Sequence, residues 1–380
     1  MKKIAIIALI SIFVFACKDS KKSPAPTDAI SEVVLAPFPD SVKAAIDSLV
    51  KQTATQHQCR VTVKIAGDST AAYYSGYDGR AGQSISDFSG SIDIGSCSKM
   101  FTATSILQLV EQNKLSLQDR LTTVLPNDTL YKGLLVLDGK DYIDSVKIID
   151  LLHHSSGFPD YFIDGDDDKE ITLHGDSTLR FTPYGLISMA KQTNKPQFIP
   201  GTTFKYCNVN YILLGLIIEK ISGESWQQYV QKNILDRLGL KQTYFASLQS
   251  PPNRAPGHFK GKMSVMPATM AGAAGEIIST LDDMQSFISG WNKGKLFSNP
   301  AFIETVRSEN FVTMSGPIKY GMGVIDLMNL SFGHAGQTFG FQSYQGVLTN
   351  GHSFSLGIDD AAVSAWEPAI FISQQLSKQQ

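Results

Sequence analysis

The order of strand-like and helix-like segments is the feature of this sequence that most constrains its fold. Residues 60–66 (RVTVKIA) alternate between apolar and polar side chains, and the Tyr- and Gly-rich residues 70–78 follow, which predicts a β-hairpin. Helical patterns dominate from Met100 to Leu240. Strand-like segments return from Tyr320 onward, and Trp366 to Gln380 predicts a closing helix. The sequence therefore predicts a helical lobe inserted into a mixed α/β lobe.

The length and composition support a folded, two-lobed protein. The chain has 380 residues, of which 43% are hydrophobic and 18% charged, so disordered and fibrous classes are excluded. This length allows a large buried core. The net charge is −2 and no long basic tract is present, which gives nucleic-acid binding little support.

The N-terminus has the pattern of a bacterial lipoprotein signal peptide. Lys2 and Lys3 precede a thirteen-residue apolar run that is too short for a membrane span of roughly 20 residues. The sequence Val-Phe-Ala-Cys ending at Cys17 resembles a lipobox, which predicts a signal peptide over 1–16 and lipidation of Cys17. Residues 17–32 are polar and predict a flexible tether. We expect a lipid-anchored protein of the cell envelope with its domain outside the cytoplasm; the alternative is a plain secretory signal.

Three cysteines remain after Cys17, namely Cys59, Cys97 and Cys207. The odd number, and the absence of a C-x-x-C spacing, argue against a disulfide framework and against a zinc site. Cys97 and Cys207 adjoin candidate catalytic residues, so a disulfide between them is conceivable. The alternative, which the sequence favours, is two small buried thiols that fill gaps in the core.

Ser96 and Lys99 form an S-x-x-K pattern at the start of a helical stretch. Residues three apart share a helix face, so the Lys99 amine can reach the Ser96 hydroxyl and accept its proton. A lysine does this only where desolvation and nearby cations lower its pKa. The pattern occurs twice more, at Ser48–Lys51 and at Ser188–Lys191. Both of these lie in segments with an amphipathic helical pattern, which is typical of Ser and Lys side chains on a helix surface.

Three further motifs accompany this pair. Residues 151–159 read LLHHSSGFP, and Tyr206-Cys207-Asn208 is the single Y-x-N of the chain, placed after Pro-Gly-Thr and before an apolar helix. His334-Ala335-Gly336 lies in a later strand-like segment. With these motifs the sequence resembles the serine β-lactamase and penicillin-binding-protein family, in the branch of class C β-lactamases, DD-carboxypeptidases and related esterases.

The resemblance implies a fold and a division of the chain. The expected fold is α/β (α+β), an antiparallel sheet flanked by helices with an inserted all-helical lobe. Residues 33–95 and 270–380 would form the α/β lobe, and residues 96–269 the helical lobe, together one β-lactamase-related domain. The active site would lie at the junction of the lobes.

The resemblance also implies roles for individual residues. Ser96 would be the nucleophile, and Lys99 and Tyr206 would handle its proton. Asn208 would hydrogen-bond Lys99 and the substrate. The backbone N–H groups of Gln337 and Ser96 would form the oxyanion hole.

His334 and Gly336 would occupy the position of the family's K-T-G strand, with Gly336 allowing the substrate backbone to approach closely. Class C β-lactamases carry Lys where this chain has His334, and that cation binds the antibiotic's carboxylate. Because a histidine is only partly charged near neutral pH, the exchange favours a peptidase or esterase over a β-lactamase.

The sequence thus predicts a monomeric serine hydrolase that cleaves an amide or ester bond in a D-amino-acid peptide or small ester through an acyl-enzyme. No metal or organic cofactor is implied, and residues 164–170 fail as a calcium loop because Lys169 and Gly175 replace the required Gly and Glu. His153 and His154 are interpreted as structural. A class C-like β-lactamase and a catalytically silent peptidoglycan-binding protein are the alternatives.

Overall fold

The computed structural model describes residues 38–67, 72–162 and 178–379. The predicted signal peptide (1–16), the lipidation site Cys17 and the tether (17–32) lie outside these ranges, as does the acidic segment 164–170. None of the helices within the described ranges combines the length and apolar character needed to cross a membrane.

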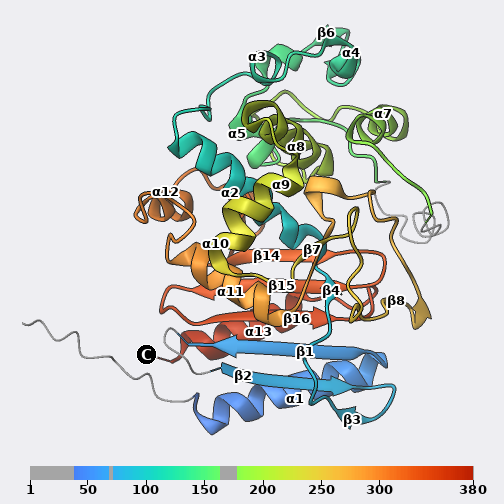
Figure 1. The fold of residues 1–380 in the computed structure, drawn as a ribbon, viewed down its shortest axis with the longest axis vertical. Helices are drawn as coiled ribbons and strands as arrows, with labels where there is room; N and C mark the ends of the chain where they lie inside the picture. Colours follow the sequence, from blue (N-terminus) through green and yellow to red (C-terminus); the bar gives the residue numbers. More distant parts are fainter. Residues whose placement is uncertain (1–37, 68–71, 163–177, 380) are drawn as a thin grey trace, which may run out of the picture. The chain divides into compact units, whose positions relative to one another are not determined.

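A large antiparallel sheet lies at the centre of the described structure (Figure 1). Among the described residues it has nine strands, in the order β11-β12-β13-β14-β15-β16-β1-β2-β3. Their bounds are β1 (Arg60–Ala66), β2 (Ala72–Asp78), β3 (Gln83–Ser84), β11 (Val312–Ser315), β12 (Ile318–Tyr320), β13 (Ile325–Leu327), β14 (Ser331–Gln337), β15 (Gln342–Leu348) and β16 (Ser353–Ile358). The strands come from both ends of the chain, which confirms the predicted fold class.

Strand β1 joins the two halves of this sheet. It pairs with β2 over its whole length, which confirms the predicted hairpin, and with β16 on its other edge. Val61, Val63 and Ile65 are buried on one face of β1. Because side chains alternate along a strand, Lys64 points to the opposite face, where its amine lies 2.6 Å from the Asp282 carboxylate.

Helices cover both faces of the sheet. Helices α1 (Asp40–His57) and α13 (Trp366–Ser377) pack on one face, where Ile46 and Ile372 are fully buried in a shared apolar cluster. Helix α11 (Leu281–Asn292) packs on the opposite face against β1, β15 and β16. The predicted closing helix is thereby confirmed as α13.

The remaining helices lie mostly beyond the β14 side of the sheet (Figure 1). They are α2 (Ser98–Glu111), α3 (Leu121–Val124), α4 (Asp128–Tyr131), α5 (Ile148–Leu152), α7 (Pro183–Thr193), α8 (Asn208–Ser222), α9 (Trp226–Val230), α10 (Asp236–Leu238) and α12 (Phe302–Ser308). Short turns complete them, η1 (Gly95–Cys97), η2 (Ile143–Ser145), the π-turn η3 (Gln231–Leu235) and η4 (Gly272–Ala274). Helix α8 is apolar nearly all round and correspondingly buried.

A small sheet sets the start of α2 beside the large one. Its strands are β4 (Ile92–Asp93), β10 (Ile277–Ser279) and β7 (Tyr244–Phe245), in the order β4-β10-β7. Two short hairpins pair β5 (Val136–Leu137) with β6 (Lys140–Asp141) and β8 (His258–Phe259) with β9 (Lys262–Met263). After β4, the Ile94 N–H donates to the Ile277 carbonyl over 3.0 Å, and the chain enters η1 and α2. The division into lobes at 95/96 and 269/270 stays a prediction.

Candidate active site

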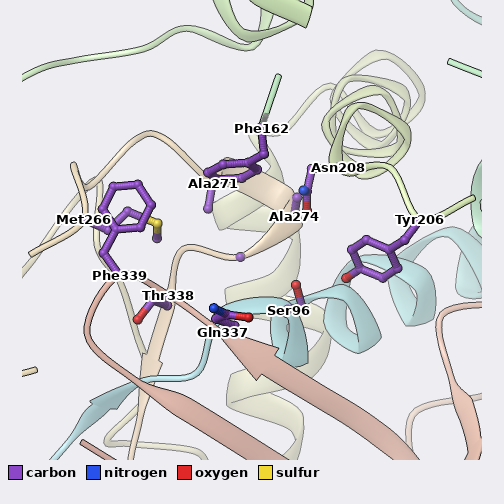
Figure 2. A pocket seen from close by; sticks show the side chains of 11 residues that line it. Ser96, Phe162, Tyr206, Asn208, Met266, Ala271, Ala274, Gln337, Thr338 and Phe339 are labelled. Carbon is purple, nitrogen blue, oxygen red and sulfur yellow. The ribbon is translucent and has the colours of Figure 1, made fainter. Parts of the chain in front are cut away.

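A pocket of about 210 Å³ lies where η1, the end of β14 and the start of α8 meet (Figure 2). Four of the sequence-predicted residues line it: Ser96, Tyr206, Asn208 and Gln337. The other lining residues are Phe162, Met266, Ala271, Ala274, Gly275, Thr338 and Phe339. Lys99, His334 and Gly336 lie behind these residues and do not line the pocket.

Ser96 occupies the turn η1 directly before α2. The preceding Gly95 has φ +50°, a left-handed conformation that favours glycine. A Cβ on Gly95 would lie 2.6 Å from the carbonyl oxygen of Gln337 and 2.8 Å from its nitrogen. Glycine at this position therefore lets η1 pack directly on β14 and brings Ser96 beside the Gln337 backbone.

Lys99 lies one turn into the helical segment, and its amine reaches back to the serine. Its Nζ is 2.9 Å from the Ser96 Oγ, 2.8 Å from the Asn208 Oδ1 and 2.7 Å from the carbonyl oxygen of Ala274. The side chain is fully buried. Burial lowers the pKa of Lys99 to about 7, while the nearby Asp160 carboxylate acts in the opposite direction.

Two of these contacts fix the direction of the lysine's lone pair. The Ala274 carbonyl can only accept hydrogen bonds, and the Asn208 amide presents its oxygen because its nitrogen donates to Asp160 over 3.0 Å. A neutral amine has two N–H groups and one lone pair. With both N–H groups engaged, the lone pair points at the Ser96 hydroxyl, as a general base requires.

Asp160 holds Asn208 from two sides. The Asp160 Oδ2 accepts the backbone N–H of Asn208 at 2.8 Å as well as its side-chain N–H. Because Asn208 is the first residue of α8, the carboxylate also lies at a helix N-terminus, where negative charge is favoured. Burial raises the pKa of Asp160, and the hydrogen bond from the Asn208 backbone opposes that shift.

Tyr206 places its hydroxyl on the pocket side of Ser96 (Figure 2). The Lys99 amine lies 4.9 Å from the centre of the Tyr206 ring. Burial raises the pKa of Tyr206 well above its usual value, and the Ser96 hydroxyl opposes this shift. The phenol is therefore protonated at neutral pH and is suited to donate a proton rather than to accept one.

The Gln337 backbone is oriented to serve an oxyanion. Across the β14–β15 hairpin the Thr338 N–H donates to the Phe341 carbonyl at 2.9 Å. Because hydrogen-bonded pairs alternate in antiparallel strands, the N–H of Gln337 points away from β15 and toward the edge on which Gly95 packs. This places it beside the Ser96 turn; its role in an oxyanion hole stays a prediction.

Gly336 is close to the chain itself and not to the pocket. A Cβ at this position would overlap the Ile94 carbonyl oxygen and the Ser343 hydroxyl. The sequence interpretation had assigned the glycine to a close approach by substrate backbone. The structure contains a close approach between β14 and the segment that leads into η1, so Gly336 supports Ser96 from behind. Its role toward substrate stays a prediction.

His334 is buried on β14 and faces aromatic side chains. Its Nδ1 donates to the Ala335 carbonyl, so its Nε2 accepts the hydroxyl hydrogen of Tyr320 at 2.9 Å. Burial, and then the Lys99 charge, lower the pKa of His334 to about 3. A neutral, fully engaged imidazole therefore occupies the position at which the sequence predicted a partly charged substrate-binding group.

Several supporting residues were missed or set aside in the sequence interpretation. Asp160, Ala274 and Tyr320 belong to no motif that the sequence displays. His154 was interpreted as structural; it accepts the Cys207 backbone N–H at 3.1 Å, and its ring lies 4.1 Å from the Tyr206 ring between centroids. The sequence signals for this neighbourhood are the LLHHSSGFP segment, which Asp160 directly follows, and the Tyr206-Cys207-Asn208 motif, whose residues contact His154 and Asp160.

The cysteines beside the site are free. Cys97 and Cys207 are both buried, and each thiol donates to a backbone carbonyl, of His334 and of Pro159 respectively. Burial raises the pKa of Cys97 to about 12. These thiols are packing groups, as the favoured interpretation of the sequence had it.

The sheet between helices and the Ser–Lys–Tyr cluster at its edge define a protein of the serine penicillin-binding-protein-like fold. The family described as "Beta-lactamase" matches residues 46–353, which is most of the chain, and the protein belongs to this family.

Individual relatives are more distant. A putative penicillin-binding protein, PbpX of Bacillus subtilis, is 29% identical over 60% of this chain and 52% of its own length. A putative D-alanyl-D-alanine carboxypeptidase of Escherichia coli is 31% identical over 41% of this chain and 34% of its own. The chain thus matches only about half or a third of the length of these relatives.

Two solved structures match along nearly their whole length. A D-stereospecific amidohydrolase from Streptomyces sp. superposes with a TM-score of 0.72 and 25% identity, covering 86% of this chain and 97% of its own. A D-amino acid amidase from Ochrobactrum anthropi gives a TM-score of 0.73 at 19% identity, covering 90% of this chain and 100% of its own, which bears on the fold alone.

Proposed function

We propose that the protein is a serine hydrolase that cleaves an amide or ester bond through an acyl-enzyme on Ser96. The observation that carries this proposal is the place of the Lys99 amine, 2.9 Å from the Ser96 Oγ with the Asn208 and Ala274 oxygens as its other two partners. In the neutral form of the amine these two oxygens take its N–H groups, which leaves the lone pair for the Ser96 hydroxyl. With a pKa of about 7, a useful fraction of Lys99 is the free base at neutral pH.

In the first half of the reaction the Ser96 Oγ bonds to the substrate carbonyl carbon while its proton moves to Lys99. The N–H groups of Ser96 and Gln337 stabilise the oxyanion. The bond to the leaving nitrogen or oxygen then breaks, and the leaving atom takes a proton from Tyr206, which is replaced by the proton that Lys99 received. The products of this half are the acyl-enzyme and a neutral leaving group.

In the second half water attacks the acyl carbon. Lys99 accepts one proton of the water, and the carbon–Oγ bond breaks as the serine oxygen recovers a proton. The net reaction adds one water to the amide or ester. The neutral state of His334 supports substrates that need no bound carboxylate, and similarity to an amidohydrolase supports amides, with D-amino-acid peptides and small esters as the substrate classes.

A fluorophosphonate probe tests the nucleophile. We expect covalent labelling of the purified protein, with mass spectrometry mapping the adduct to Ser96 and none in a Ser96→Ala variant. Full labelling or full esterase activity in that variant would refute the assignment. Rapid turnover of a chromogenic cephalosporin would favour a β-lactamase instead, and failure of both this probe and a fluorescent penicillin would favour a silent binding protein.

We also propose that the protein is a lipoprotein of the bacterial cell envelope, anchored through Cys17. The support is the sequence alone: two lysines, a short apolar run and a lipobox-like tetrapeptide. Growth of a bacterium expressing the full chain with an alkyne-tagged fatty acid should label the wild type and not a Cys17→Ser variant. Equal labelling of both would remove the proposal.

A further inference from the structure

The pocket has two chemically different ends, with Ser96 between them. Figure 2 shows Tyr206 at one end and the Met266–Phe339 pair at the other. In the proposed reaction Tyr206 gives its proton to the leaving atom, so the leaving group must lie at the Tyr206 end. The rest of the acyl group therefore extends from the carbonyl carbon toward Met266 and Phe339.

Apolar side chains form that second end. Phe162, Met266, Ala271 and Phe339 line it, and the Phe162 and Phe339 rings meet edge to face with centroids 6.4 Å apart. Met266, Ala271 and Phe339 belong, with Met270, to a small apolar cluster separate from the two large cores. Methionine and phenylalanine together make an adaptable surface for a flat apolar group.

No charged side chain lines the described pocket. Among its eleven described residues the one titratable group is the phenol of Tyr206, which is protonated. The Lys99 amine lies behind Ser96 and is saturated by its three partners. These residues therefore offer no counter-charge to a carboxylate or an ammonium on the acyl group.

We propose that this end of the pocket is a binding subsite for a bulky apolar acyl group, of about the size of an aromatic ring. The volume agrees, because a cavity of about 150 Å³ holds a benzene molecule and this pocket has about 210 Å³ for the ring and the scissile bond. The inference rests on the proposed hydrolase function. It adds that the acyl side of the scissile bond, and not the leaving group, sets the specificity.

Esters with one leaving group and different acyl groups test the subsite. We would measure kcat/KM for p-nitrophenyl esters of acetic, 3-phenylpropionic and 3-(4-carboxyphenyl)propionic acid, each divided by its rate of spontaneous hydrolysis. The phenylpropionyl ester should exceed the acetyl ester by about tenfold or more, since burial of an apolar group in a fitted pocket is worth that much. The carboxyphenylpropionyl ester, which carries a carboxylate on the ring, should fall below the phenylpropionyl ester by a similar factor.

Two variants test whether the preference for the phenylpropionyl ester arises in this pocket. Ala271→Phe fills the apolar end, and Phe339→Ala opens it; each should reduce the ratio of phenylpropionyl to acetyl kcat/KM toward one. Leu248→Ser is a matched control, because Leu248 is 70% exposed and lies outside the pocket. This variant should keep the wild-type ratio. Phe339→Ala decides the question where Ala271→Phe fails to fold.

The outcomes separate this inference from the proposed function. A wild-type ratio near one, or a ratio that neither variant changes, overturns the subsite while Ser96 labelling and acetyl-ester hydrolysis leave the hydrolase intact. Absence of both labelling and hydrolysis overturns the proposed function, and the subsite with it. A preferred carboxyphenylpropionyl ester would also overturn the subsite, because it requires a counter-charge at the acyl end.

Discussion

At the scale of single residues, the candidate site depends on one buried amine, that of Lys99, which must be uncharged and must direct its lone pair at the Ser96 hydroxyl. Lys99 has no carboxylate within its hydrogen-bond set, and its partners are a hydroxyl, an amide oxygen and a carbonyl. Uncharged partners satisfy the amine without the strong preference for the ammonium form that a direct ion pair would give. Asp160 lies one residue further out and acts through Asn208.

The lowered pKa of Lys99 predicts the pH dependence of activity. Below about pH 7 the amine is protonated and cannot accept the serine proton, so kcat/KM should fall about tenfold per pH unit toward acid and level off above pH 7. His334, with a pKa of about 3, stays neutral throughout this range. The measurement is kcat/KM for a neutral ester from pH 5 to 9.

Glu276 supplies the control for this profile. Burial raises its pKa to about 7 as well, and it adjoins the pocket residue Gly275. A Glu276→Gln variant should retain the acid limb, because this carboxyl does not contact Lys99. Loss of the limb in that variant would assign the titration to Glu276, and a flat profile in the wild type would contradict a lysine base altogether.

The Asp160→Asn variant tests whether activity depends on the orientation of the Asn208 amide, because it keeps Asn208 and removes the carboxylate that orients it. Without an acceptor-only partner the Asn208 amide can turn, so kcat/KM at pH 8 should fall by about ten- to a hundredfold. The acid limb should also move to lower pH, because the Asp160 charge raises the pKa of Lys99. Asp40→Asn, at a side chain that is 99% exposed, should change neither quantity. A fall in kcat/KM without a moved limb would reduce Asp160 to a structural role.

At the scale of elements, the site depends on how closely η1 packs on β14. Both glycines at this contact, Gly95 and Gly336, leave no room for a Cβ because backbone atoms of the opposite segment fill the space. The Ser96 and Gln337 amides are therefore adjacent because two segments more than 200 residues apart in the sequence meet without side chains between them.

Gly95→Ala should disrupt that contact. The added Cβ would meet the Gln337 backbone at 2.6 Å, so we expect the Ser96 and Gln337 amides to separate. If they form the proposed oxyanion hole, kcat should fall by about a hundredfold or more. Gly82→Ala is the matched control, since Gly82 also has positive φ, at +66°, but nothing within 4 Å of a Cβ. It should cost about 1 kcal/mol of stability and keep full kcat. Equal kcat losses in both variants would show that backbone strain alone is responsible.

The sequence could predict those contacts of the site that join residues close together in the chain. The Ser96–Lys99 contact is one helical turn long, and Tyr206 and Asn208 share a local motif, so the pattern sufficed. Asp160, Ala274 and Tyr320 reach the site only through tertiary packing, and their sequence contexts resemble ordinary loops and strands. The burial of His334 was equally hidden, because alternation along a strand tells which residues share a face but not what covers it.

At the scale of the whole molecule, the two kinds of structure share one apolar core. The largest cluster of buried side chains runs from the helices into the sheet, for example from Leu213 of α8 through Phe101 of α2 to Val347 of β15. Phe101 stacks on Phe287 of α11 with ring centroids 3.7 Å apart, which links α2, the helix directly after Ser96, to the helix that covers the sheet. A second cluster under α1 and α13 shares the same strands from the other face.

This continuity predicts that the described chain unfolds as a single cooperative unit. Ile372→Ala in α13 and Ile187→Ala in α7 remove fully buried side chains at opposite ends of the molecule, each at a cost of about 2–5 kcal/mol. Scanning calorimetry should show one transition in the wild type and one in each variant, lowered by several degrees, with fluorophosphonate labelling lost at the same temperature. If Ile372→Ala instead split the transition, and labelling survived the first step, the sheet and the helical part would be separate folding units. In that case the apolar core that the helices and the sheet share would not be the interaction that holds Ser96 against β14.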